Sequence, residues 1–272
     1  MHLMVGDVQS TRLLRAIMYS EDMSKPPVPA KSAYPMRINK YLAHEGIATR
    51  RGADDLIEKK KVLINGRIAV LGDKVSESDR VELAGTITPK KYLYFAYNKP
   101  LGVITHSPQL GEKDIKQSIT KKGGPEKSEM SDVFPIGRLD KDSHGLIILT
   151  NDGRVTDRLL NPDYDHDKEY RVRTLDPIRD SFKKYMESGV DIEGYLTAPC
   201  KVRKTGPNTF NITLTEGKKH QIRRMVAALH NQVADLERVR ILNIRLDGLH
   251  PNATRPIKGE ELETFLSQIG MK

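Results

Sequence analysis

A short polar loop ahead of an apolar strand carries the residues best suited to chemistry. Residues 137–145 read GRLDKDSHG and lead into 146–149, whose short unbroken apolar run predicts a buried strand. Asp140 lies at the centre of this loop, two residues from Arg138 and two from a second carboxylate, Asp142. A carboxylate that its surroundings keep ionised can act as a nucleophile or a base. Residue types alone leave open a second interpretation, a solvated turn carboxylate.

The loop and the strand after it resemble a known motif. Residues 137–153, GRLDKDSHGLIILTNDG, resemble the catalytic loop of the pseudouridine synthases, in the RsuA/RluB/RluE/RluF branch that modifies ribosomal RNA. The resemblance implies that Asp140 is the aspartate that opens a uridine N-glycosidic bond, after which the base turns and reattaches through carbon. It leaves open which atom Asp140 attacks or deprotonates first. DHDKEYRV and KDSHGL are most similar to the large-subunit enzymes of the RluF and RluB kind.

Two further motifs carry candidate partners of Asp140. DHDKEYRV resembles the second motif of the family, which implies that Tyr170 stacks on the target uracil. Such stacking recovers about 1–3 kcal/mol of the cost of extruding a base. EGKKHQIRRM resembles the third motif, which implies that Arg223 binds the Asp140 carboxylate as a bidentate fork and keeps it ionised. A core tyrosine and a surface arginine are the simpler interpretations. Arg138 is expected to probe the space left by the extruded base, and Asp142 to fix the loop.

Composition favours a polyanionic partner and a reducing compartment. The chain has 272 residues, a formal net charge of +9 and a pI near 9.4, which suits contacts with phosphate. Its single cysteine, Cys200, excludes an intramolecular disulfide. No stretch approaches the roughly 20 apolar residues of a membrane span, and no signal peptide is evident. We therefore expect a cytoplasmic protein without a membrane partner.

No cofactor or metal is expected. The reaction that the resemblance implies needs no redox partner, phosphate donor or metal. The eight histidines form no metal-binding pattern, because no Cys, Asp or Glu set adopts a ligand spacing with them.

Residues 36–84 predict a small module of two helices and a hairpin. Thr49 is placed to cap the second helix, and Asn65-Gly66 between two apolar runs predicts a tight type I′ turn. Four basic residues fall near the two helix starts, where they can help to bind phosphate; they are Arg37, Lys40, Arg50 and Arg51. An ordinary solvated helix face is the alternative.

The same module resembles the αL RNA-binding motif. The resemblance lies in MRINKYLAHEGIATRRGADDLI followed by VLINGRIA. This motif is shared by a small-subunit ribosomal protein and several RNA-modifying enzymes, and it implies that Arg50 and Arg51 contact RNA. Its position before a pseudouridine synthase domain is the order that the branch uses.

The chain divides into four parts. We expect a flexible leader at 1–35, the RNA-binding module at 36–84, a linker at 85–91 and a catalytic domain at 92–272. Predicted strands outnumber helices without regular alternation, which indicates an α+β fold with a mostly antiparallel mixed sheet. In the catalytic domain we expect strands at 92–97 (half-buried), 103–105, 146–149, 168–174, 200–203, 209–214, 233–236 and 243–246, and helices at 115–119, 155–160, 177–187, 221–230 and 260–269.

A second basic region follows the third motif. Residues 217–255 contain eight Lys or Arg and three Asp or Glu. The side chains expected to follow an RNA backbone are Lys218, Lys219, Arg224, Arg238 and Arg240.

Together these features predict a monomeric enzyme that acts on ribosomal RNA or an assembling subunit. We expect it to isomerise one uridine, of 23S RNA, to pseudouridine by base flipping. A 16S RNA target and a non-catalytic RNA-binding assembly factor are the alternatives. A glycosidase using Asp140 and Asp142 is disfavoured, because two acids two residues apart do not establish the separation across a sugar that such enzymes need.

Overall fold

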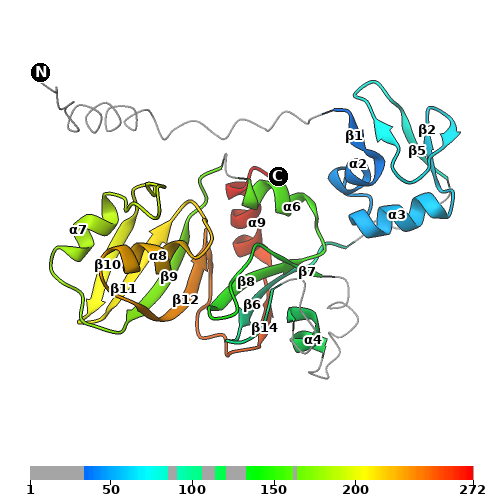
Figure 1. Ribbon diagram of the computed structural model, residues 1–272. Coiled ribbons are helices and arrows are strands. Elements are labelled where there is room, and N and C mark those ends of the chain that lie inside the picture. The colour runs from blue at the N-terminus through cyan, green and yellow to red at the C-terminus, as the bar shows by residue number, and fades with distance from the viewer. Residues whose placement is uncertain (1–33, 85–90, 106–113, 121–132, 162–163, 272) are drawn as a thin grey trace, which may run out of the picture. The chain divides into compact units, whose positions relative to one another are not determined.

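The fold is taken from a computed structural model that describes residues 34–84, 91–105, 114–120, 133–161 and 164–271 (Figure 1). Most of the predicted leader (1–33), most of the predicted linker and most of 106–131 lie outside these residues. Figure 1 draws the elements by label, and these labels are used below.

The first module folds around its own apolar core. Ile38 and Leu42 from one helix and Ala53 and Ile57 from the next pack on the strands that follow. Its elements are β1 (Met36–Arg37), α2 (Ile38–His44), α3 (Arg50–Glu58), β2 (Val62–Ile64), β3 (Arg67–Ile68), β4 (Lys74–Val75) and β5 (Val81–Leu83).

Local sequence signals account for this module. The Thr49 hydroxyl accepts a hydrogen bond from the Gly52 amide at 3.1 Å, so the predicted cap is confirmed. Asn65 and Gly66 have φ values of 51° and 78°, the two positive values that a type I′ turn requires. The predicted hairpin is therefore also confirmed.

The second part of the chain is a nine-stranded sheet with helices. Its strand order is β10-β11-β9-β12-β8-β6-β14, with β13 on β12 and β7 on β8. Its elements are β6 (Tyr94–Lys99), α4 (Ile115–Thr120), β7 (Phe134–Ile136), β8 (His144–Thr150), α6 (Arg154–Leu160), β9 (Lys168–Thr174), α7 (Phe182–Glu187), β10 (Lys201–Gly206), β11 (Thr209–Leu214), α8 (Gln221–Ala228), β12 (Val233–Ile241), β13 (Ile244–Arg245), β14 (Thr254–Pro256) and α9 (Gly259–Gln268).

The sheet has two halves that meet at β8 and β12. These two strands run parallel through two residue pairs, Glu237 with His144 and Arg238 with Gly145, whereas every other strand pair in the described residues is antiparallel. One half packs with α7 and α8, and the other with α6 and α9 (Figure 1). The predicted α+β class with a mostly antiparallel mixed sheet is confirmed.

Two expectations near the start of this domain were wrong. The first strand, β6, is buried at all six positions instead of half-buried, because apolar clusters cover both of its faces. Residues 103–105 make a single bridge instead of a strand. They contact the loop that contains Asp140, since the Thr105 hydroxyl bonds the Leu139 carbonyl, and the Val103 carbonyl accepts a hydrogen bond from Lys99.

Two further elements differ from their predicted extent. The helix predicted from Pro177 begins at Phe182, because the Ile178 amide bonds the Pro207 carbonyl at 2.8 Å and ties this segment to the β10–β11 turn. The strand predicted to end at Leu236 continues to Ile241 as β12, in the middle of the sheet.

Candidate active site

The loop around Asp140 connects β7 to β8 and is held along its whole backbone. The main-chain carbonyl of each residue from 138 to 142 accepts a hydrogen bond. The donors are Arg238 to Arg138 (3.3 Å), the Thr105 hydroxyl to Leu139 (2.8 Å), the Ser143 amide to Asp140 (3.1 Å), the Gly102 amide to Lys141 (2.9 Å) and Arg223 to Asp142 (2.6 Å). Segments far apart in the sequence therefore fix the conformation of this loop.

The Asp140 carboxylate is partly exposed and faces a histidine. Its Oδ1 lies 3.6 Å from Nε2 of His220, and 38% of the Asp140 side chain is accessible. His220 immediately precedes α8 and has a φ of 52°. This neighbour was not predicted from the sequence, although His220 lies within the third motif, three residues before Arg223.

Arg223 does not form the expected fork with Asp140 in this structure. Its Nη2 donates to the Asp142 carbonyl at 2.6 Å and its Nη1 to the Val233 carbonyl at 3.3 Å. Arg223 thus contacts the loop through its backbone.

Tyr170 shares a face of the sheet with the loop. It lies on β9 opposite Arg238 of β12, and directly paired residues of neighbouring strands project to the same face. Tyr170 packs against two apolar clusters, and one of them includes Ile147 and Leu139, the residue that precedes Asp140.

A buried lysine lies under the loop. Lys99 is fully buried, and its Nζ donates to the carbonyls of Val103 at 2.7 Å and Pro100 at 3.1 Å. Burial lowers the pKa of Lys99 to about 8, against the opposing attraction of the Asp140 and Asp142 carboxylates and with a smaller lowering by Arg238. Below this pKa, the protonated Lys99 interacts favourably with both loop carboxylates.

The lowered pKa of Lys99 predicts that the free energy of unfolding depends on pH. Because the folded state lowers the pKa of Lys99 from 10.5, the unfolded chain binds more protons between pH 8 and 10.5, and stability should rise across that interval. Relative to Lys99→Met, the free energy of unfolding of the wild type should increase by on the order of 3 kcal/mol from pH 7.5 to 10.5. Urea unfolding of both proteins measures this difference, and a constant difference would contradict it.

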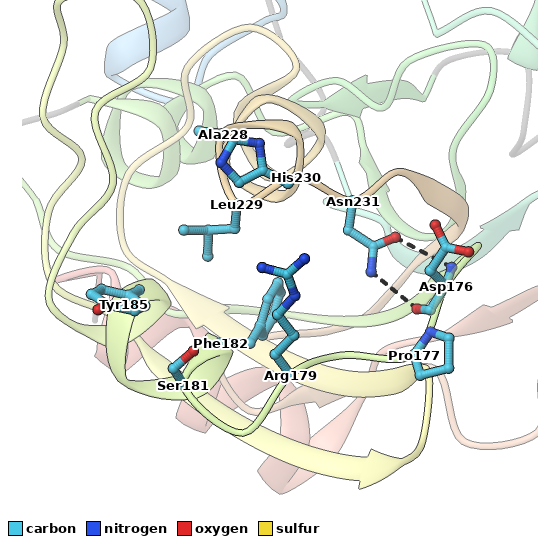
Figure 2. Close-up of a pocket in the computed structure, with 10 residues that line it drawn as sticks. All are labelled: Asp176, Pro177, Arg179, Ser181, Phe182, Tyr185, Ala228, Leu229, His230 and Asn231. Carbon is cyan, nitrogen blue, oxygen red and sulfur yellow. Dashed lines mark hydrogen bonds between the residues drawn. The ribbon is translucent and has the colours of Figure 1, made fainter.

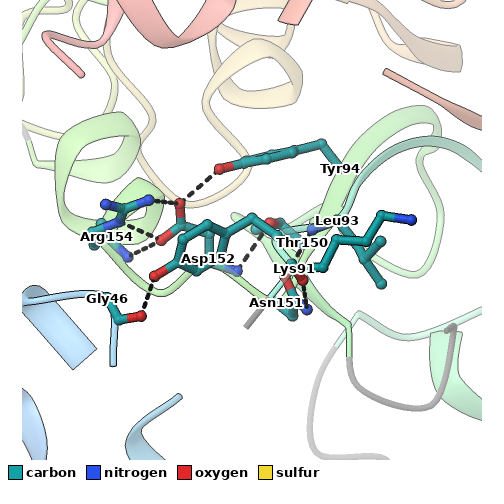
Figure 3. Close-up of polar contacts among 9 residues, drawn as sticks. Gly46, Lys91, Leu93, Tyr94, Thr150, Asn151, Asp152 and Arg154 are labelled. Atoms are coloured by element: carbon teal, nitrogen blue, oxygen red, sulfur yellow. Dashed lines mark hydrogen bonds and ion pairs between the residues drawn. The ribbon is translucent and has the colours of Figure 1, made fainter. Parts of the chain in front are cut away.

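A second polar cluster stabilises the far end of β8 (Figure 3). The buried Asp152 carboxylate accepts hydrogen bonds from the Tyr94 hydroxyl at 2.6 Å and from the Arg154 guanidinium at 2.7 and 2.9 Å. Burial and this hydrogen bond raise the pKa of Tyr94. The cluster joins β6 to the start of α6, at the opposite end of β8 from Asp140.

The other predicted RNA-binding residues differ in their exposure. Arg37, Lys40, Arg50, Arg138, Lys218 and Lys219 are exposed, whereas Arg51 lies in α3 and its side chain is outside the described part. Arg224 is partly engaged within the protein, because it donates to the Ile192 carbonyl at 2.7 Å and to Glu193 at 2.8 Å.

Arg238 and Arg240 do not lie on an RNA-facing surface, which corrects the prediction. Arg238 is only 4% exposed. Arg240 binds Glu169 at 3.0 Å and the Leu242 carbonyl at 2.7 Å, and 16% of its side chain is exposed. Both belong to β12, which extends five residues beyond the strand predicted at 233–236.

A pocket of about 460 Å³ lies at the other end of α8 (Figure 2). Arg179, Tyr185 and His230 line it, and Asn231 bonds the backbone of Asp176 at its rim. His220 and Asp140 lie at the start of α8, about 12 Å away along a helix of eight residues. This pocket is therefore separate from the loop that holds Asp140.

The described residues contain no group of three or more His, Cys, Asp or Glu side chains that could hold a metal ion. Within the same residues, no helix combines the length and apolar character needed to cross a bilayer.

Comparison with known families assigns this arrangement of sheet and loop. The RNA pseudouridylate synthase family model matches residues 93–228, and the S4 domain model matches residues 36–81. The chain belongs to the RNA pseudouridylate synthase family, with an S4 domain at its N-terminal side.

Individual relatives agree with this assignment. The dual-specificity RNA pseudouridine synthase RluF of Escherichia coli K12 is 40% identical over 231 residues, which cover 84% of this chain and 77% of the relative. The ribosomal large subunit pseudouridine synthase B of Bacillus subtilis is 34% identical over 238 residues, 84% of this chain and 94% of the relative. A crystal structure of a pseudouridylate synthase superposes with a TM-score of 0.61 at 30% identity, covering 84% of this chain and 99% of that one. The protein is an RNA pseudouridine synthase.

Proposed function

We propose that this enzyme isomerises a specific uridine of large-subunit ribosomal RNA to pseudouridine, with Asp140 as its catalytic carboxylate. The observation that supports this role is the loop itself: five consecutive carbonyls are bonded, while the Asp140 side chain stays 38% exposed. Fixing a reactive group beside a site open to a ligand is what catalysis by orientation requires.

The chemistry is balanced without a cofactor. The N-glycosidic bond breaks, and the same sugar carbon forms a bond to a carbon of the uracil ring. That ring carbon loses its proton, and the ring nitrogen released from the sugar gains one. Asp140 assists the bond exchange, and the Tyr170 ring supports the flipped uracil. Arg223, through the Asp142 carbonyl, holds the loop.

The substrate class rests on the relatives and on the S4 domain. The relative in Bacillus subtilis is named a large-subunit enzyme, and RluF is named dual-specificity. Arg37, Lys40 and Arg50 are exposed on the module of the present chain and are available for phosphate contacts, and Arg51 is proposed to join them. We propose that the protein acts in the cytoplasm as a monomer on ribosomal RNA or an assembling subunit.

Tyr170→Leu should lower the single-turnover rate about 5- to 100-fold, because loss of a stacking ring costs about 1–3 kcal/mol per base. Tyr170→Phe is the matched control and should retain the platform. Pseudouridine formation under single-turnover conditions measures both. Equal loss in the two variants would show that the hydroxyl, and not the ring face, matters.

The proposed large-subunit substrate is tested by incubating the purified protein with each candidate RNA in a separate reaction. Protein-free 23S RNA, 16S RNA, transfer RNA and isolated subunits are treated and then mapped for pseudouridine. One modified position in 23S RNA or the large subunit is the expected result. Modification confined to 16S RNA would overturn the large-subunit assignment, and an additional transfer RNA site would establish a second substrate.

A further inference from the structure

Arg238 is a buried arginine whose side chain reaches both ends of the loop that contains Asp140. Its Nε donates to the Leu146 carbonyl at 2.7 Å, and its Nη1 donates to the Arg138 carbonyl at 3.3 Å. The side chain thus bonds a residue on each side of Asp140. One planar group therefore sets the separation between the two ends of the loop.

The backbone of Arg238 lies equally close to this loop. Arg238 pairs with Gly145 across the short parallel contact between β12 and β8 (Figure 1). A methyl group on Gly145 would lie 2.4 Å from the Arg238 carbonyl oxygen and 2.7 Å from its nitrogen. The opposite neighbour of Arg238 in the sheet is Tyr170, so one row of residues connects the end of the loop to the proposed base platform.

The charge of Arg238 does not account for its presence as a stabilising interaction of the fold. In the described residues, Arg238 bonds main-chain carbonyls and forms no ion pair, and its buried Nη2 has no hydrogen-bond partner. Its charge also contributes to lowering the pKa of Lys99 and of Lys168, after burial as the main cause. Burying a charge removes its hydration, and in the described residues no ion pair offsets this cost for Arg238. An arginine at this position is better explained by its geometry.

We propose that Arg238 is a positioning residue for pseudouridine formation, which spaces the ends of the 138–146 segment and so directs Asp140 toward Tyr170. This inference rests on the proposed catalytic role of Asp140. The guanidinium fork makes its two bonds at a fixed separation, whereas a lysine ammonium is a single point donor on a flexible stem. Lysine would keep the charge and lose the spacing.

Arg238→Lys therefore tests the spacing, with Arg240→Lys as a matched control on the same strand. Arg240 is also mostly buried and bonds a main-chain carbonyl, but it contacts Leu242 and Glu169 instead of the loop. We expect Arg238→Lys to lower kcat about 10- to 100-fold with KM within about twofold, since small misplacement of a reacting group costs rate at saturation. Arg240→Lys should change kcat by less than about threefold.

Hydrogen exchange provides a readout that does not need activity. In Arg238→Lys, amides in 138–146 should exchange faster while those of β9 keep their protection, and in Arg240→Lys the loop should be unchanged. Unchanged kcat and loop exchange in Arg238→Lys, or equal loss in both variants, would overturn the inference. A wild type inactive on every RNA would instead contradict the proposed function, and the loop exchange would still decide whether Arg238 holds the loop.

Discussion

The Asp140→Asn variant is expected to form pseudouridine at least about 1,000-fold more slowly than the wild type, with little change in RNA affinity. Asparagine preserves the shape of the side chain and its proximity to His220, which lies 3.6 Å away, but it cannot act as a nucleophile or accept a proton as a base. Pseudouridine formation under single-turnover conditions and direct RNA binding measure the two effects separately.

Asp142→Asn is the matched control for this result. Asp142 is exposed, and its contact with Arg223 uses the main-chain carbonyl, which the substitution leaves in place. Its rate should stay within about threefold of the wild type, as is usual for an exposed side chain away from the reacting atoms. Equal losses in the two variants would indicate that loop charge in general, and not the Asp140 carboxylate, is required.

Gly145→Ala is expected to be the most damaging small substitution in the described part of this domain. Its φ of 104° is a backbone conformation that costs a non-glycine residue about 1–3 kcal/mol. The overlap of the new methyl group with the Arg238 backbone at 2.4 Å adds about 1–3 kcal/mol. The free energy of unfolding should therefore fall by about 2–6 kcal/mol, and the rate should fall because the end of the loop must move.

Gly102→Ala separates these two causes. Gly102 has a φ of 79°, but a methyl group there would meet nothing within 4 Å. It should therefore cost only the backbone strain of about 1–3 kcal/mol. Urea unfolding of both variants gives the difference, and equal losses would show that the close approach of β8 and β12 contributes nothing.

Local and periodic sequence signals predicted most of the secondary structure. The alternating strand at 168–174 is found with those bounds, and the cap at Thr49 and the Asn65-Gly66 turn follow from residue types alone. These features depend on interactions within a few residues. The α+β class follows from the order of such elements along the chain.

Long-range contacts account for what the sequence did not predict. A charged stretch containing Arg238 and Arg240 does not have the pattern of a central strand, and burial of its arginines depends on carbonyls and a carboxylate from distant segments. The 103–105 segment was predicted as a strand because it is apolar and β-branched, yet its Thr105 hydroxyl bonds Leu139 in the loop around Asp140, and its Val103 carbonyl accepts a hydrogen bond from Lys99.

The candidate site shows the same division between local and distant information. The motif that contains Asp140 is contiguous, so the sequence located the loop. The partners of the loop lie in three other segments, and the sequence assigned Arg223 to the Asp140 carboxylate when the structure places it on the Asp142 carbonyl. His220 lies next to Asp140 on a left-handed backbone at φ 52°, and its place in the third motif does not by itself predict this conformation.

The most direct test of Asp140 as the catalytic carboxylate is pseudouridine mapping of ribosomal RNA from cells that lack this protein. The cells are complemented with the wild type, with Asp140→Asn or with Asp142→Asn, each produced at the same level. We expect one uridine of large-subunit RNA to lose its modification in the deletion and to regain it with the wild type and Asp142→Asn only. Restoration of that position by Asp140→Asn would contradict the central role of this carboxylate.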